Sequence, residues 1–299
     1  MPKWFQSISS SRKAILGLIS IVLAAAYTPI IIRYAQAENV PSLTIILLRL
    51  WIIALALTPI ILTRHRADFR GLTRRDWAWV GAAGILHAVN LSLLFFSLEY
   101  TSVLINSVLR RTSPLWTAGM EVLFLSAMFS RRVWWGALLI VFGTTLVGLG
   151  SSAGGVGSHY LLGGGLALLN ALTDSVYFVI GRRIRHKIPY LPYSWAVFVG
   201  AAITTSVAVL VTHTPVLGLS AWGYWLVFWI AVLAQVFGHI PINGVLRHIP
   251  ATMLTISLQL SVIVSAVLAI FLLGEFPSAW QLVGSGLILV GVVVATGRG

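Results

Sequence analysis

The sequence contains no cysteine and little charge. None of its 299 residues is cysteine, which excludes a disulfide framework, a zinc–thiolate centre and thiolate catalysis. Only 9% of the residues are charged, whereas a soluble globular domain carries about a quarter. Because so few charged side chains cannot cover the surface of a soluble protein of this length, an ordinary soluble globule is excluded as well.

Acidic residues are scarcest, with seven aspartates and glutamates against 20 lysines and arginines and a net charge of +13. Such an excess often indicates a nucleic-acid-binding protein, which carries basic residues over much of one face. Here the basic residues form short clusters between long apolar runs, and hydrophobic residues make up 58% of the chain. This pattern is typical of an integral membrane protein and argues against a nucleic-acid partner.

Apolar runs long enough to cross a bilayer follow one another along the chain. A helix needs about 20 apolar residues to cross about 30 Å of hydrocarbon. The sequence therefore predicts an all-α membrane protein with ten transmembrane helices. Their predicted ranges are 13–35, 41–63, 75–97, 102–128, 132–150, 159–182, 190–212, 220–246, 250–273 and 277–297. The first range is too long for the apolar part of a signal peptide, so we interpret it as a retained span.

The basic residues lie mostly on one side when successive loops are assigned to alternate sides of the membrane. Sixteen of the 20 share the side of the N-terminus, Arg33 lies opposite, and Arg49, Arg110 and Arg111 lie inside predicted spans. The positive-inside rule therefore predicts that both termini are cytoplasmic. We expect a multi-pass protein in contact with lipid in a plasma membrane, namely the inner membrane of a bacterium.

The two halves of the chain align without a gap at an offset of 148 residues. The most informative matched pairs are Pro41 with Pro189, Trp77 with Trp225, Ser113 with Ser261, Gly136 with Gly284 and Gly143 with Gly291. We predict a five-helix repeat over 1–150, a linker rich in glycine and serine over 151–158, and a second repeat over 159–299. Because five is odd, the second repeat enters the membrane in the opposite orientation, which is typical of secondary transporters.

Three groups of short motifs resemble one family. They are Leu98 to Ser102 followed by Ser113-Pro114-Leu115, Phe271 to Glu275 followed by Trp280-Gln281 and Gly284 to Gly291, and Arg49-Leu50 with the apolar run after it. Together they resemble the drug/metabolite transporter superfamily, EamA type, over essentially the whole chain. The resemblance implies a 5+5 inverted repeat in which helices 1–4 and 6–9 surround the substrate path, and the chain is also similar to the amino-acid exporter branch.

The chain departs from the family pattern at two points. Glu275 ends a helix in the second copy, whereas the matching position of the first copy, Ala127, has no carboxylate. The first helix also lacks the membrane carboxylate of the small multidrug members. This second departure argues against a proton-antiport mechanism of that kind.

Polar residues inside the predicted spans indicate where substrate binds, because a charged side chain at the bilayer centre costs about 2.5–3.5 kcal/mol on insertion scales. The offset of 148 pairs His87 with Gln235 and Arg111 with Gln259, which suggests symmetric polar positions around one central cavity. Asp174 is the best acidic candidate because it lies mid-span beside Tyr177, with no cation nearby in its own helix. The predicted substrate-binding residues are Tyr27, His87, Asn90, Arg110, Arg111, Trp116, Asp174, Tyr177, Gln235, His239 and Gln259.

Helical spacing adds two expectations. Asn170, Asp174 and Tyr177 share one helix face. Neighbouring Arg110 and Arg111 point about 100° apart, so both cannot face the same cavity squarely. We expect that one of them pairs with Glu121, backbone carbonyls or lipid headgroups.

Other polar and small residues have structural interpretations. Asn170, His239 and Asn243 could equally be hydrogen-bonding groups between packed helices. Arg49 is interpreted as structural, either snorkelling to the interface or binding a carbonyl. The glycines of the fifth and tenth spans permit close helix packing, within the chain or in a homodimer.

A zwitterion with an apolar side chain would use all of these groups. His87, Arg110 or Arg111 would bind its carboxylate, Asp174 its ammonium group, and aromatic rings its side chain. We therefore predict an exporter of amino acids, aromatic or hydrophobic ones first, working by alternating access without a cofactor or metal, as a monomer or homodimer. The alternative within transport is an exporter of cationic or amphipathic drugs that depends on Asp174 or Glu121. A membrane enzyme is disfavoured, because the loop acids are scattered singly and form no metal site or nucleophile–base cluster.

Overall fold

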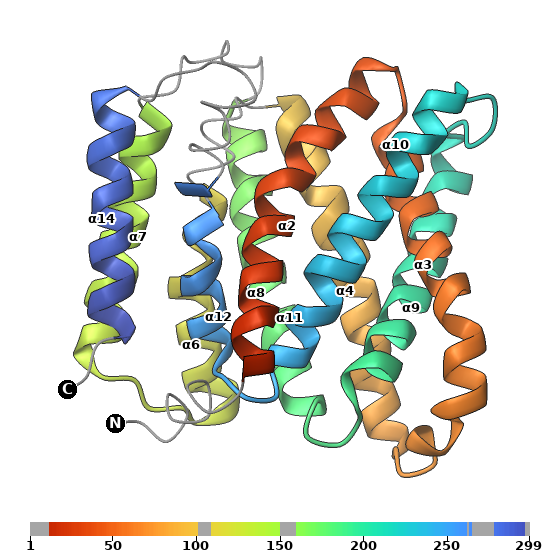
Figure 1. Cartoon of the computed structure of the whole chain (residues 1–299), viewed down its shortest axis with the longest axis horizontal. Helices are drawn as coiled ribbons and strands as arrows, with labels where there is room; N and C mark the ends of the chain where they lie inside the picture. The colour runs from red at the N-terminus through yellow and green to blue at the C-terminus, as the bar shows by residue number, and fades with distance from the viewer. Residues whose placement is uncertain (1–11, 101–108, 150–159, 262, 265–277, 297–299) are drawn as a thin grey trace. The chain divides into compact units, whose positions relative to one another are not determined.

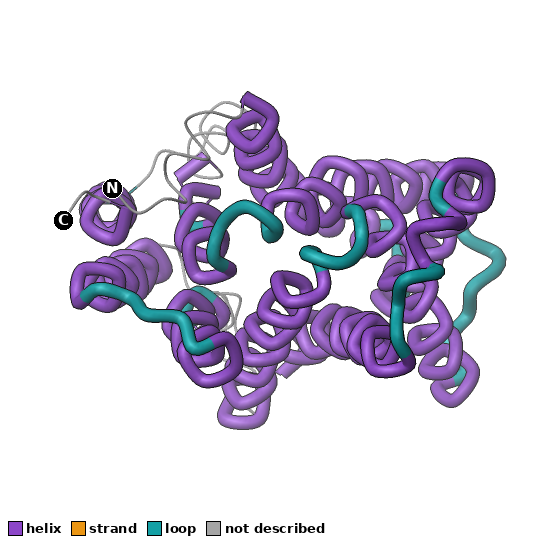
Figure 2. Tube along the Cα trace, turned by 90° about the horizontal axis from the view of Figure 1, so that it is seen from below, coloured by secondary structure: helices purple, strands orange, loops and turns teal. Residues whose placement is uncertain are grey.

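The computed structural model describes residues 12–100, 109–149, 160–261, 263–264 and 278–296, and in these residues the secondary structure is entirely helical (Figures 1 and 2). Each predicted span contains a helix. The elements are α2 (Arg12–Ala37), α3 (Ser42–Arg64), the 3₁₀ turn η1 (Arg66–Phe69), α4 (Arg74–Tyr100), α6 (Ser113–Leu125), α7 (Arg131–Leu149), α8 (Tyr160–Ile184), α9 (Tyr190–Thr212), α10 (Ala221–Ala231), the π-helical segment η2 (Val232–His239), α11 (Ile240–Val245), α12 (Ala251–Leu258) and α14 (Ala279–Thr296).

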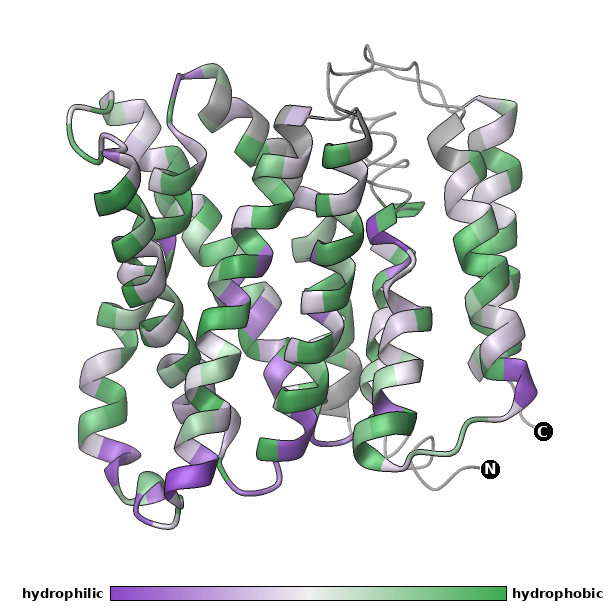
Figure 3. Cartoon of the chain, turned by 180° about the vertical axis from the view of Figure 1, so that it is seen from behind, coloured by the Kyte–Doolittle hydropathy of each residue, from purple (hydrophilic) through white to green (hydrophobic). Residues whose placement is uncertain are grey.

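The helices have the length and surface of membrane spans. Among the described residues, five stretches are long and apolar enough to cross a bilayer, namely Ser42–Arg64, Arg74–Ser97, Leu162–Ile184, Tyr190–Thr212 and Ala221–Val245. Figure 3 shows apolar residues along the helices and hydrophilic residues mainly at helix ends and in loops. Large apolar side chains such as Leu123, Leu210 and Val211 are more than 70% exposed. A surface of this kind is stable in hydrocarbon rather than in water, so the all-helical, multi-pass membrane protein is confirmed.

The helices pack into two compact units that do not coincide with the two halves of the sequence. Unit 1 consists of the described parts of Leu93–Val179 and Ile249–Gly299, and unit 2 of those of Ser11–Ser92 and Ile180–His248. Each unit thus takes helices from both halves. The chain passes from one unit to the other within α4 and within α8.

Prolines mark the beginnings of three helices. Pro41, Pro189 and Pro250 occupy the N-cap positions of α3, α9 and α12, with φ between −61° and −55° and extended ψ. The pyrrolidine ring fixes φ near −65°, so each proline sets the direction in which its helix begins. Pro41 and Pro189 are one of the matched pairs of the sequence, and α3 and α9 therefore begin at corresponding positions.

In unit 1, α7 and α14 cross antiparallel with their backbones in contact. A Cβ atom on Gly136 would lie 2.5 Å from the carbonyl oxygen of Gly291, and one on Gly143 would lie 2.6 Å from that of Gly284. The crossing is centred on the fully buried Ile140 and Ile288. Of the two uses predicted for these glycines, the structure shows packing within the chain.

In unit 2, α3 packs on α9, and α2 packs on η2, α10 and α11. An apolar cluster joins the end of α2 and the beginning of α3 to the second half of α10. Its buried members are Ala35, Val40, Ile45, Leu226, Val227 and Ile230. This cluster fixes α10, and with it the π-helical segment that continues α10.

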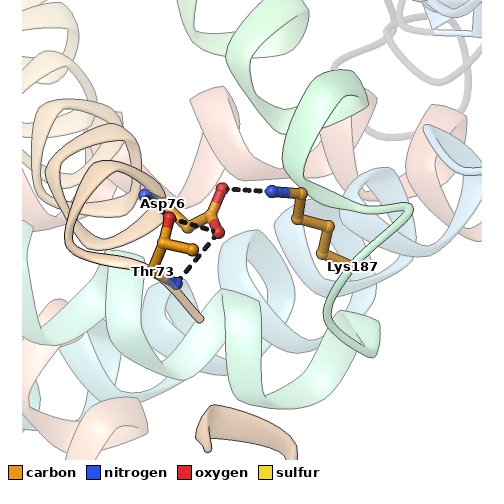
Figure 4. A network of polar contacts seen from close by, with 3 residues as sticks. All are labelled: Thr73, Asp76 and Lys187. Atoms are coloured by element: carbon orange, nitrogen blue, oxygen red, sulfur yellow. Dashed lines mark hydrogen bonds and ion pairs between the residues drawn. The ribbon is translucent and has the colours of Figure 1, made fainter. Parts of the chain in front are cut away.

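A polar network fixes the beginning of α4 in unit 2 (Figure 4). The Asp76 carboxylate accepts hydrogen bonds from the backbone N–H and the hydroxyl of Thr73, at 3.0 and 2.8 Å. The Thr73 hydroxyl accepts in turn from the N–H of Asp76 at 3.2 Å, which completes a capping box. Lys187, in the loop between α8 and α9, lies 2.7 Å from the other carboxylate oxygen. The network therefore ties two loops on one side of unit 2.

The buried Arg185 holds the end of α8 in unit 2. Its Nε donates to the carbonyl oxygen of Asn243 at 2.6 Å, and Nη1 donates to that of Ile188. Burial lowers the pKa of the guanidinium to about 10, so it stays charged at neutral pH. A cation bound to carbonyls near the C-terminal end of α11 is favoured by the helix dipole.

We predict that Gly136→Ala destabilises the protein. The added methyl group overlaps the backbone of α14 and forces the two helices apart, which costs about 1–3 kcal/mol, as overpacked cores do. The thermal unfolding midpoint in detergent should fall by several degrees. Gly286→Ala is the matched control, because a Cβ there would meet no atom within 4 Å. Equal midpoints for the two variants would contradict the packing described.

We also predict that Asp76→Ala lowers the unfolding midpoint by more than Lys187→Ala does. The first substitution removes the capping box and the ion pair together, whereas the second removes only an ion pair whose lysine is half-exposed. Thermal unfolding of both variants in the same detergent gives the ranking. A larger fall for Lys187→Ala would show that the ion pair, and not the cap, stabilises this end of α4.

Candidate functional site

The predicted site residues are divided between the two units. Unit 1 contains Arg110, Arg111, Trp116, Asp174, Tyr177 and Gln259, and unit 2 contains Tyr27, His87, Asn90, Gln235 and His239. Each set is described by itself below. The single central cavity inferred from the sequence stays a prediction.

In unit 1, Arg110 and Arg111 lie at an interruption in a helix. Helical backbone ends at Arg110, residues 111–112 form a turn, and α6 begins at Ser113. Pro114 explains the break, because it has no N–H to donate to the carbonyl of residue 110. The prediction of one continuous helix over 102–128 is therefore wrong at this point. It is also wrong at its end, where Ser126 adopts a left-handed conformation that terminates α6.

A second interruption occurs at the matching position of the second half. Helix α12 ends at Leu258, and Gln259 lies in a turn. Arg111 donates from Nη1 to the Oε1 atom of Gln259 and to the hydroxyl of Ser261, at 3.4 Å each. These bonds are long and weak, but the first joins residues at corresponding positions of the two halves. Arg111 and Gln259 are the pair matched by the offset of 148, and the structure places them in contact.

Arg110 has different partners, as the angle between the two arginines requires. Its Nε donates to Oδ1 of Asn170 on α8 at 2.7 Å. Asp174, one turn further along α8, is half-buried and interacts electrostatically with Arg110. Asn170 and Tyr177 on the same face are buried. Unit 1 thus brings a guanidinium, an amide and a carboxylate into one cluster, which we call the Arg110 cluster.

Glu121 makes contacts that the sequence did not predict. The sequence offered it as a partner of Arg110 or Arg111 and as a residue on which drug export would depend. Its buried carboxylate accepts hydrogen bonds from the N–H groups of Ala251 and Thr252, at 2.9 Å each, and from the Thr252 hydroxyl at 2.7 Å. A carboxylate at the N-terminus of α12 satisfies donors that the helix leaves unpaired and is favoured by the helix dipole. These contacts give Glu121 a structural role at the start of α12.

In unit 2, the two predicted histidines meet. The rings of His87 on α4 and His239 on η2 pack edge to face with their centroids 4.5 Å apart, and Phe198 of α9 lies beside His87 at 6.1 Å. The sequence did not predict the π-helical segment that carries His239. In such a segment each N–H bonds five residues back, and π-helical turns are frequent at functional sites. The widened turn places Gln235 and His239 close to one face of η2.

Arg49 is buried, and part of its guanidinium lacks a hydrogen-bond acceptor in the described part of the chain, which the sequence did not predict. Its side chain is only 3% exposed, and neither Nε nor Nη2 has a hydrogen-bond acceptor among the described residues. It interacts electrostatically with His87 and His239. The expected roles, snorkelling or binding a carbonyl, do not match a buried guanidinium of this kind. The sequence gives no signal for this isolation, because it depends on which side chains come close to Arg49 in space.

The other predicted residues differ in exposure. Tyr27 and Trp116 are 37% and 42% exposed, and the Trp116 indole N–H donates to the Thr112 hydroxyl at 2.9 Å. The Tyr177 ring is enclosed beside Phe178. Asn90 is buried one turn after His87. In the described parts of the chain no group of three histidine or acidic residues could hold a metal ion.

The family follows from a comparison with known proteins. The profile of the EamA-like transporter family matches residues 12–149 and, a second time, residues 161–297. The chain belongs to the EamA-like transporter family. It therefore falls in the drug/metabolite transporter superfamily, as the motifs indicated.

Two similar proteins are also named as transporters. The chain is 24% identical to the uncharacterized transporter YdfC of Bacillus subtilis (strain 168) over 64% of its own length and 61% of YdfC, so the match leaves more than a third of YdfC uncovered. It is also 24% identical to the uncharacterized transporter YyaM of the same organism, over 72% of this chain and 71% of YyaM. A protein of known crystal structure shares the fold with a TM-score of 0.75, at 19% identity, over 96% of this chain and 97% of that protein.

We predict that Glu121→Ala unfolds at a lower temperature without changing substrate affinity. The substitution leaves two buried N–H groups of α12 without their acceptor, which costs about 1–3 kcal/mol for each unsatisfied group. Glu121→Gln keeps one acceptor oxygen and should have a smaller effect. Thermal unfolding in detergent ranks the stabilities of the two variants. Counterflow in proteoliposomes gives the half-saturation concentration for substrate of the protein that remains folded. A change in that concentration without loss of stability would return Glu121 to the substrate site.

Proposed function

We propose that this EamA transporter exports amino acids, those with aromatic or hydrophobic side chains first, by alternating access between two five-helix repeats of opposite orientation. The observation that carries the proposal is the Arg110 cluster of unit 1. It combines a guanidinium held by Asn170 with the carboxylate of Asp174 on the same face of α8. An α-amino acid presents the complementary pair of charges.

The chemistry of the cluster favours a zwitterion. A guanidinium can donate two parallel hydrogen bonds to a carboxylate, and an aspartate can accept from an ammonium group. In a site of low dielectric constant each of these interactions is stronger than in water. A substrate with only one of the two charges leaves one protein group without its partner, so the cluster selects for both.

The interrupted helices support a transport mechanism. Transporters with inverted repeats bind substrate where helices are broken at corresponding positions of the two copies. Here the breaks lie at residues 111–112 and at Gln259, and Arg111 contacts Gln259. The double match to the family profile and the antiparallel crossing of α7 with α14 also support an inverted repeat.

The proposal extends to location and orientation. Sixteen basic residues on one side of the membrane favour cytoplasmic termini in a plasma membrane. The relatives found in Bacillus subtilis support a bacterial inner membrane. Because the glycines of α7 and α14 are used within the chain, they give no reason to require a dimer.

The rival substrate class, cationic and amphipathic drugs, is less well supported by the charges. Well inside the predicted spans lie Arg49, Arg110 and Arg111, whereas the described acids there are Asp174 and Glu121, and Glu121 binds the start of α12. An excess of buried cations repels a cationic substrate. The same excess attracts a carboxylate.

We predict that Asp174→Asn and Arg110→Gln each raise the half-saturation concentration for phenylalanine counterflow in proteoliposomes by about 10–100-fold. Each variant loses one charge-assisted hydrogen bond, worth about 1.5–3 kcal/mol. In the unmodified protein, phenylalanine should compete better than phenylpropionate, which lacks the ammonium group, and better than phenethylamine, which lacks the carboxylate. Asp174→Asn should remove the preference over phenylpropionate.

Asp68→Asn provides the matched control, because it makes the same chemical change in the loop turn η1. It should leave counterflow unchanged. Amino-acid counterflow that survives both Asp174→Asn and His87→Ala would contradict the site. Transport of tetraphenylphosphonium that depends on Asp174, with no competition by amino acids, would establish the drug-exporter alternative in its place.

A further inference from the structure

The interior of unit 2 carries a positive charge without an acidic partner from the same unit. Arg49 lies in α3 and is 3% exposed. The acidic residues of unit 2 are Glu38, Asp68 and Asp76, and none lies in the middle of a helix. Glu38 is exposed. Asp68 pairs with His65, and Asp76 pairs with Lys187, both near the ends of helices. A buried charge without compensation is costly, so this arginine needs an explanation.

The unpaired atoms of Arg49 form one edge of its guanidinium group. Nε and Nη2 are both buried and have no acceptor in the described part of the chain. Their N–H groups point in parallel from the same side of the planar group. Two parallel donors match the two oxygens of a carboxylate, which is the geometry of bidentate arginine–carboxylate pairs.

A second polar group in the same unit also lacks a partner. Gln235 is fully buried, and neither its Oε1 nor its Nε2 atom has a hydrogen-bond partner among the described residues. It lies on η2, which packs against α3. His239, four residues later on η2, interacts electrostatically with Arg49 and packs on His87. The unpaired amide therefore lies on the element that faces the Arg49 region.

We propose that unit 2 contains a binding site for a monovalent carboxylate, with the Nε and Nη2 edge of Arg49 as its bidentate donor and the Gln235 amide as a further donor. A bound carboxylate neutralises the buried guanidinium and satisfies donors that otherwise remain unpaired. Chloride would offer a single point of contact and fits the two parallel donors less well. The site does not depend on the amino-acid proposal, because no residue of the Arg110 cluster takes part in it.

The test is thermal unfolding of the purified full-length protein in detergent, with sodium acetate replacing sodium chloride at constant ionic strength. We expect acetate to raise the unfolding midpoint by about 2–4 °C, with a rise that follows the logarithm of the acetate concentration above the Kd. Acetamide, which has the same shape without the charge, should have no effect. An equal midpoint in both salts, or a higher one in chloride, would overturn the proposal.

Substitutions of Arg49 locate the effect. Arg49→Gln should abolish the acetate response, and Arg49→Lys, which keeps the charge but loses the bidentate edge, should weaken apparent acetate binding at least about 10-fold. Arg64→Gln makes the same change at the exposed end of the same helix and should respond like the unmodified protein. If Arg49→Gln does not fold, the acetate response of Arg49→Lys provides the test. An undiminished acetate response in Arg49→Lys refutes the site, whatever the result of amino-acid counterflow.

Discussion

The structure depends on the requirement that polar groups in hydrocarbon find their partners within the protein. Outside the bilayer a helix can end freely, because water satisfies its last N–H and carbonyl groups. Inside the bilayer every interruption must be compensated. Glu121 shows the requirement directly, since its carboxylate binds the first N–H groups of α12. At the break before α6, the N–H group and the hydroxyl of Thr112 both donate to the carbonyl oxygen of Leu109.

This requirement also explains why the polar clusters of the two units differ. In unit 1, Arg110 has Asn170 and Asp174 as neighbours, so cation and anion occur together. In unit 2, Arg49 lies among histidines and an amide, without a carboxylate of that unit. The first arrangement resembles a receptor for a molecule with both charges. The second resembles a receptor for an anion alone, which is the basis of the carboxylate site proposed for unit 2.

The sequence predicted the helices well because their signals are local. Runs of apolar residues gave the ten ranges, and Pro41, Pro189 and Pro250 gave three of their beginnings. The π-helical segment was missed because one wider turn does not change the apolar character of Val232–His239. The partners of Glu121 and the isolation of Arg49 were missed for another reason. Both depend on which side chains come close in space, and one sequence without relatives contains no signal for that.

The offset between the halves predicted more than single residues did. It matched Arg111 with Gln259 before any contact was known, and the structure shows that contact. It could not predict that the compact units would combine helices from both halves. Similarity at corresponding positions shows which residues are equivalent, whereas packing decides which helices become neighbours. Sequence correspondence and helix packing are independent, and the contact between Arg111 and Gln259 depends on both.

The glycine crossing of α7 and α14 has a consequence for how mutations in this region combine. Gly136 faces Gly291 and Ala295, and Gly143 faces Gly284, with backbone against backbone. Space taken by a side chain at one position is lost by the position opposite. Substitutions in α7 and in α14 therefore affect the same contact, although the two helices are encoded by distant parts of the gene. A methyl group gained at Gly136 meets the Gly291 carbonyl oxygen and the Ala295 methyl group together, so the residues that would have to move to accommodate it lie about half a chain length away.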